Sequence, residues 1–174
     1  MPHDHDQEFS SPLRDQLEDF LDQHRRAMYD CLEGLTEEEA RRSLVPSLTT
    51  LLGLVRHVTF VERVWFDEAV TGRSRQEIGI PTTVDASFTL APEDTVDSVR
   101  AAYAEACAAS RAATSQLDVD AVLTGNRRGP LPLRWVYLHM LREIAQHCGH
   151  ADILREQVLA ARDSDGRAEP QRVP

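Results

Sequence analysis

Three polar side chains interrupt an otherwise apolar helical seam near the end of the chain. In the stretch LREIAQHCGH, residues 141–150, Glu143 and His147 are four residues apart, and His150 follows three residues later. Side chains with this spacing lie on one face of an α-helix. Carboxylate and imidazole groups on a buried face are costly unless they are paired or bind a metal. The spacing therefore indicates either a Glu–His ion pair or part of a metal site.

His57 interrupts a second apolar stripe, within LLGLVRHVTFVERVWF. A divalent metal held by His57, Glu143 and His147 would satisfy all three buried groups, and three protein ligands leave the open coordination position typical of catalytic sites. Two structural alternatives remain open. In the first, His57 is only a core histidine with a hydrogen-bond partner. In the second, Glu143 and His147 form an ion pair that only specifies packing. The chain contains no HExxH motif and no Glu-x-x-His pair of the kind found in di-iron bundles.

Apolar residues recur at three- and four-residue steps in four long segments, which predicts four helices. The segments are residues 13–32, 48–70, 92–117 and 133–161. Residues 73–91, which include DASFTL, are expected to form a long crossover loop between the second and third helices, and residues 118–131 a turn before the fourth. The expected fold class is all-α, a four-helix bundle over residues 12–162. The polar ends, residues 1–11 and 163–174, are expected to be disordered tails.

The overall composition indicates one globular domain and disfavours several classes of partner. The 174 residues carry a formal net charge of -10, which disfavours binding to nucleic acids or anionic membranes. No apolar run approaches the roughly eighteen residues of a membrane-spanning helix, and the acidic N-terminus does not resemble a signal peptide. The three cysteines are far apart, so no disulfide framework is expected. The cytoplasm is the expected location.

The segments SLTTLLGLVRHVTFVERVWF and LHMLREIAQHCGHADILRE resemble the DinB-like (DinB/YfiT) superfamily, most closely its actinobacterial subgroup that includes mycothiol-dependent transferases. This resemblance implies a bundle that holds one divalent metal, zinc or nickel, through a second-helix histidine and two fourth-helix residues four apart. His57 and His147 match two of these ligands. Glu143 stands where many members have histidine, a departure similar to that in maleylpyruvate isomerase-like members. His150 stands where many members have glutamine, which implies contact with the thiol cosubstrate or support of a ligand.

The resemblance also implies a reaction, which is thiol S-transfer. The metal would activate a small thiol such as mycothiol, and the thiolate would attack an electrophile. A homodimer is implied as well. Surface arginines, such as Arg56, Arg142 and Arg155, are candidates for binding anionic groups of the substrates. Two other functions remain open: a metal-dependent hydrolase that activates water, and a non-enzymatic metal-binding stress protein that binds partners through a metal-stabilised surface.

Overall fold

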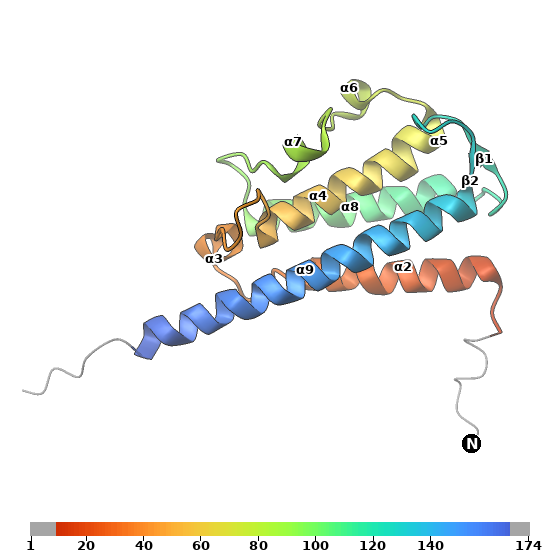
Figure 1. Ribbon diagram of the computed structural model, residues 1–174. Coiled ribbons are helices and arrows are strands. Elements are labelled where there is room, and N and C mark those ends of the chain that lie inside the picture. Colours follow the sequence, from red (N-terminus) through yellow and green to blue (C-terminus); the bar gives the residue numbers. More distant parts are fainter. Residues whose placement is uncertain (1–9, 168–174) are drawn as a thin grey trace, which may run out of the picture.

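The computed structural model describes residues 10–167, with side chains up to residue 162, and shows a bundle of four long helices (Figure 1). They are α2 (Leu13–Asp30), α4 (Leu51–Arg63), α8 (Val96–Thr114) and α9 (Leu133–Arg167). Helix α2 packs along α9, and α4 packs against both α8 and α9. The predicted all-α four-helix bundle is therefore confirmed. Within residues 10–167, no helix is both long and apolar enough to cross a membrane.

Hydroxyl caps determine where the second and third long helices begin. The Thr50 hydroxyl accepts a hydrogen bond from the backbone N–H of Gly53, and Thr95 accepts one from Ser98. Such caps satisfy backbone N–H groups that have no partner inside the helix. The two helices therefore begin at residues 51 and 96, slightly later than the apolar pattern predicts. The buried core shared by all four long helices includes Leu21, Met28, Leu54, Val58, Tyr103, Met140 and Ile144.

A π-helical turn, η1 (Val64–Glu68), continues α4 and leads into the short helix α5 (Ala69–Thr71). Such turns widen a helix locally and are frequent at functional sites. Trp65 and Glu68 of this turn are buried, and both line a cavity beside α9. The predicted second helix is thus a composite of α4, η1 and α5.

The long crossover between α5 and α8 is present, but it contains two short helices. They are α6 (Arg75–Ile78) and α7 (Val84–Phe88), and the DASFTL segment, predicted as loop, begins inside α7. The hydroxyls of Ser74 and Thr83 cap these helices, which explains why they form in a segment with few helix formers. Helix α7 packs on α4, and the crossover follows α4 along the outside of the bundle (Figure 1).

Two further features lie in the connections between the long helices. Helix α3 (Glu37–Arg41) begins at a capping box and lies between α2 and α4. Strand β1 (Val122–Leu123) pairs antiparallel with β2 (Leu131–Pro132), with Leu123 opposite Leu131. This pairing closes the turn that precedes α9.

Helix α9 continues to Arg167, beyond its predicted end and past the predicted domain boundary at residue 162. Arg162 supports the extension, because its guanidinium pairs with Glu39 at 2.6 Å and donates to the carbonyl of Gly34. Residues 163–167 are therefore helical, while the predicted domain boundary at residue 162 stays a prediction. Residues 1–9 and 168–174 lie outside the described residues, so disorder there stays a prediction.

Gly125 docks the connection between α8 and α9 on α5. Its backbone N–H donates to the carbonyl of Ala69 at 3.1 Å, and a Cβ here would lie 2.2 Å from the carbonyl oxygen of Glu68. We expect Gly125→Ala to lower the free energy of unfolding by about 1–3 kcal/mol, the usual cost of overpacking. Urea denaturation measures this change.

Gly149 provides the matched control for this substitution. It lies within α9, and a Cβ there would meet no heavy atom within 4 Å. Gly149→Ala is expected to raise the free energy of unfolding by about 0.5–1 kcal/mol, because alanine favours the helix. Equal effects of the two substitutions would contradict the close docking of Gly125.

Candidate metal centre

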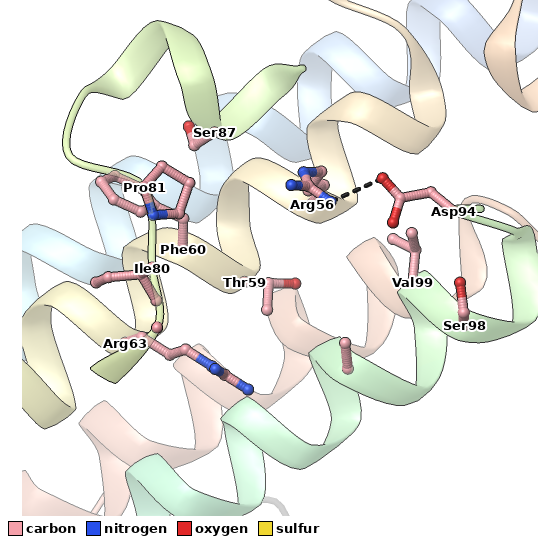
Figure 2. Close-up of a pocket in the computed structure, with 12 residues that line it drawn as sticks. Arg56, Thr59, Phe60, Arg63, Ile80, Pro81, Ser87, Asp94, Ser98 and Val99 are labelled. Carbon is pink, nitrogen blue, oxygen red and sulfur yellow. Dashed lines mark hydrogen bonds and ion pairs between the residues drawn. The ribbon is translucent and has the colours of Figure 1, made fainter. Parts of the chain in front are cut away.

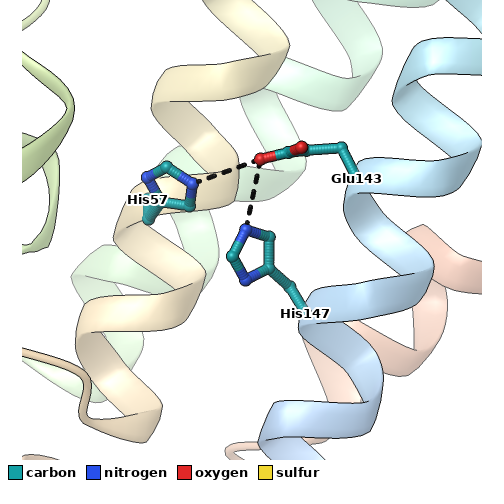
Figure 3. A group of neighbouring side chains, drawn as sticks. All are labelled: His57, Glu143 and His147. Atoms are coloured by element: carbon teal, nitrogen blue, oxygen red, sulfur yellow. Dashed lines mark hydrogen bonds and ion pairs between the residues drawn. The ribbon is translucent and has the colours of Figure 1, made fainter.

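The side chains of His57, Glu143 and His147 converge between α4 and α9 (Figure 3). Nε2 of His147 lies 3.3 Å from Oε1 of Glu143, and Nε2 of His57 lies 3.7 Å from the same oxygen. One donor atom from each residue lies within 4.8 Å of the other two. The fold thus brings together the three residues that the sequence pattern assigned to one metal.

These separations fit ligands that share one metal ion. Zinc binds histidine nitrogen and carboxylate oxygen at about 2.0–2.2 Å, so two ligands of a tetrahedral zinc lie roughly 3.3–3.6 Å apart. The observed distances of 3.3 Å and 3.7 Å are close to this range. Nε2 is the nitrogen of His147 that faces Glu143, and its Nδ1 is buried without a hydrogen-bond partner among the described residues, so Nδ1 does not contribute to this fit. Buried polar atoms seldom lack a partner.

Ser87 of α7 fixes the orientation and the tautomer of His57. The Ser87 hydroxyl donates to the carbonyl of Val84, so its oxygen accepts a hydrogen bond from Nδ1 of His57, 2.7 Å away. Nδ1 therefore carries the proton, and the lone pair of Nε2 is on the side of Glu143. Phe88 stacks on the imidazole with ring centroids 4.0 Å apart. A histidine that binds a metal through one ring nitrogen usually has a hydrogen-bond partner on the other nitrogen, as Ser87 is for Nδ1 of His57.

The surroundings favour the charge states that metal ligands need. Burial lowers the pKa of His57, which favours the neutral imidazole. The hydrogen bond from His147, and then the contact with His57, lower the pKa of Glu143 well below its usual range. The carboxylate is therefore ionised at neutral pH. A neutral imidazole and an anionic carboxylate are the forms that bind divalent metals.

A cavity of about 700 Å³ opens over this group. Its apolar wall includes Phe60, Val64, Trp65, Val84 and Phe88. Arg75, Arg127 and Arg128 add positive charge to the lining. Arg75 pairs with Glu68 at 3.0 Å, whereas Arg127 has no ion pair within the described residues. A cavity of this size and composition is typical of sites for small organic ligands.

No cysteine lines this cavity in the part of the chain that the structure describes. Cys31 and Cys107 are buried in the core, and Sγ of Cys148 lies 3.6 Å from the carbonyl oxygen of His24. Burial raises the pKa of the Cys148 thiol to about 11, so it is protonated at neutral pH. The cavity therefore offers metal ligands without a cysteine nucleophile.

Two other histidines of α9 flank the group. His139 lines the cavity, and its ring stacks on Trp135 with centroids 5.1 Å apart and meets Trp65 edge-on. His150 is exposed and is not part of the cavity lining, and its ring centroid lies 5.7 Å from that of His147. His139 therefore belongs to the cavity wall, and the contact of His150 with a thiol stays a prediction.

The arginines that the sequence singled out do not line this cavity. They are Arg56, Arg142 and Arg155. Arg56 pairs with Asp94, Arg155 donates to backbone carbonyls just after α2, and Arg142 contacts His139. Arg127 and Arg128 line the cavity instead, because the NRRGP turn that carries them folds onto α5. The only sequence feature that could have pointed to Arg127 and Arg128 as cavity residues is that they are two adjacent basic residues in a turn.

Ser87→Ala is expected to lower the affinity for a divalent metal about 10- to 100-fold, because His57 would lose the partner that fixes its tautomer. Competition with a chromophoric chelator measures this affinity. Ser115→Ala is the matched control, since that hydroxyl also bonds to a backbone carbonyl but lies at the end of α8. An equal affinity in the two variants would contradict the role of Ser87.

Comparison with known proteins adds a family and a fold. The family model described as Mycothiol-S-transferase matches residues 16–160. A solved structure described as a conserved protein from Enterococcus faecalis is similar in fold, with a TM-score of 0.60 and 15% sequence identity. The alignment covers 87% of this chain and 99% of that one. No curated protein matches the chain.

Proposed function

Because this chain belongs to the mycothiol S-transferase family, we propose that it transfers the sulfur of a small thiol, mycothiol, to an electrophile. The proposed metal ligands are His57, Glu143 and His147. One observation carries this proposal: three donor atoms converge beside a cavity of about 700 Å³ that no cysteine lines among the described residues. In the proposed reaction the thiol cosubstrate supplies the nucleophile.

The proposed metal is zinc or nickel, and the residues of the site support its binding. When bound, a divalent metal lowers the pKa of a coordinated thiol and so supplies a thiolate at neutral pH. Ser87 keeps the lone pair of His57 available, and Glu143 supplies an anionic ligand. Relative to a histidine in its place, Glu143 lowers the charge of the loaded site by one unit.

The cavity lining suggests how the two substrates are held. Aromatic and aliphatic side chains form one wall of the space over the metal ligands, and the volume of this space is within the range of sites for small organic ligands. Arg127 is free to bind an anionic group of either substrate, which makes it a better candidate than the arginines suggested by the sequence. We also propose a homodimer in the cytoplasm, as the resemblance to related bundles implies.

Cobalt substitution tests this function directly. We expect mycothiol to produce a thiolate-to-cobalt charge-transfer band in the protein loaded with Co²⁺, and glutathione or cysteine to produce a weaker band. The His147→Ala variant, treated in the same way, should show none. If cobalt binds but no thiol produces a band, thiol transfer is contradicted and the metal-dependent hydrolase becomes the better interpretation.

A further inference from the structure

A second cavity, of about 250 Å³, lies between α4, α8 and the crossover (Figure 2). Half of its lining residues are apolar or glycine, and these include Phe60, Ile80, Pro81, Val99 and Ala102. Phe60 also borders the larger cavity, but none of the three proposed metal ligands lines this one. The two cavities therefore use neighbouring faces of α4.

Three charged side chains line the second cavity: Arg56, Arg63 and Asp94. Arg56 and Asp94 form an ion pair at 2.7 Å, which the dashed line in Figure 2 marks. Their charges offset each other. Arg63 has neither an ion pair nor a side-chain hydrogen bond within residues 10–162, so its positive charge is uncompensated in this cavity.

Arg63 forms no ion pair within residues 10–162, although three acidic residues line a neighbouring groove together with it. Glu62 is bound to Arg25, and Asp67 is bound to Arg73. Glu105 of α8 lines the neighbouring groove with Arg63, but no ion pair joins them in the described part of the chain. Arg63 is therefore the arginine of this cavity that no carboxylate of the described residues pairs with.

We propose that this cavity binds a small organic monocarboxylate with an apolar body. A guanidinium matches a carboxylate with two parallel hydrogen bonds. Phe60, Ile80 and Val99 would cover the apolar part of the ligand. The cavity is smaller than the roughly 300–1,000 Å³ of typical sites for drug-sized ligands, so the ligand is the size of one ring or a short chain. One uncompensated positive charge favours a monoanion over a dianion.

One residue of this cavity also contacts the candidate metal centre. Ser87 is part of its lining and also accepts the hydrogen bond from Nδ1 of His57. Figure 2 shows Ser87 and Arg63 at opposite ends of this cavity, so a carboxylate on Arg63 would leave Ser87 and the metal ligands untouched. The binding itself does not depend on whether a metal is present.

Titration of ¹⁵N-labelled protein with benzoate, followed by NMR, tests this proposal. We expect saturable binding, with the largest amide shifts at residues 79–80 and 98–102. Arg63→Gln should weaken benzoate binding at least about tenfold, because it removes a charged hydrogen-bond partner. Benzamide, which has a similar shape and no charge, should bind the unchanged protein at least about tenfold more weakly than benzoate.

Two control variants separate this site from the larger cavity. Arg127→Gln removes the free arginine of that cavity, and His147→Ala removes a proposed metal ligand; both should bind benzoate as the unchanged protein does. The amide spectrum of each variant shows whether it is folded. An absence of saturable binding, or a loss of binding in either control but not in Arg63→Gln, would overturn the proposal. The His147→Ala variant lacks a proposed metal ligand. Benzoate binding to this variant therefore tests the second cavity independently of the proposed metal centre.

Discussion

Replacing His57 or His147 by alanine is expected to reduce tightly bound metal from about one ion per chain to almost none. Each variant leaves only two protein ligands, and a two-ligand site binds divalent metals far more weakly than a three-ligand site. Loss of a supporting partner alone costs about 10- to 100-fold in affinity, so loss of a ligand should cost about 100-fold or more. Elemental analysis of protein purified without a histidine tag measures the metal content.

His24→Ala is the matched control for these variants. His24 lies on α2, where its Nδ1 bonds to the backbone carbonyl of Phe20, and it does not line the metal cavity. Its replacement should leave the metal content unchanged. If one metal ion per chain survives in both His57→Ala and His147→Ala, the proposed centre is wrong. The same variants test the non-enzymatic alternative, which requires a large drop in melting temperature and no loss of any turnover.

Glu62→Ala is expected to cost about 3–5 kcal/mol of the free energy of unfolding, the largest stability effect that we predict. Arg25 of α2 donates to both carboxylate oxygens of Glu62 on α4, at 2.8 Å and 2.7 Å. The side chains of Arg25 and Glu62 are 6% and 0% exposed. Removal of the carboxylate would leave a buried guanidinium whose charge is only partly offset by Asp22. Urea denaturation, analysed as a two-state transition, measures the change.

Two further variants test whether burial of the ion pair causes the large loss of stability expected for Glu62→Ala. Glu38→Ala removes an ion pair with Arg42 whose carboxylate is 89% exposed and lies 3.9 Å away, so its effect should be below about 1 kcal/mol. The double variant Arg25→Met/Glu62→Leu replaces the buried pair by apolar side chains and should recover most of the stability. Similar losses in Glu62→Ala and Glu38→Ala would refute this account.

Local patterns alone predicted much of the candidate site. Glu143 and His147 are one helical turn apart, so helix geometry places them on one face without any tertiary information. The apolar stripe around His57 likewise indicated an inward-facing imidazole. Their meeting could not be derived from periodicity, because it depends on which helices pack together; the family resemblance supplied that step, and the contact between α4 and α9 agrees with it.

The sequence by itself determined four amphipathic helices and the residue types that bind a divalent metal, because both follow from side-chain chemistry at short separations along the chain. The tertiary structure decided what surrounds those ligands. Ser87 reaches His57 only because α7 packs on α4, and Arg127 reaches the cavity only because its turn docks on α5. Contacts of this kind join residues far apart in sequence, and they depend on how side chains of different segments fit together. Hydrophobic periodicity shows which face of a segment is buried, but it carries no information about which segment will cover that face.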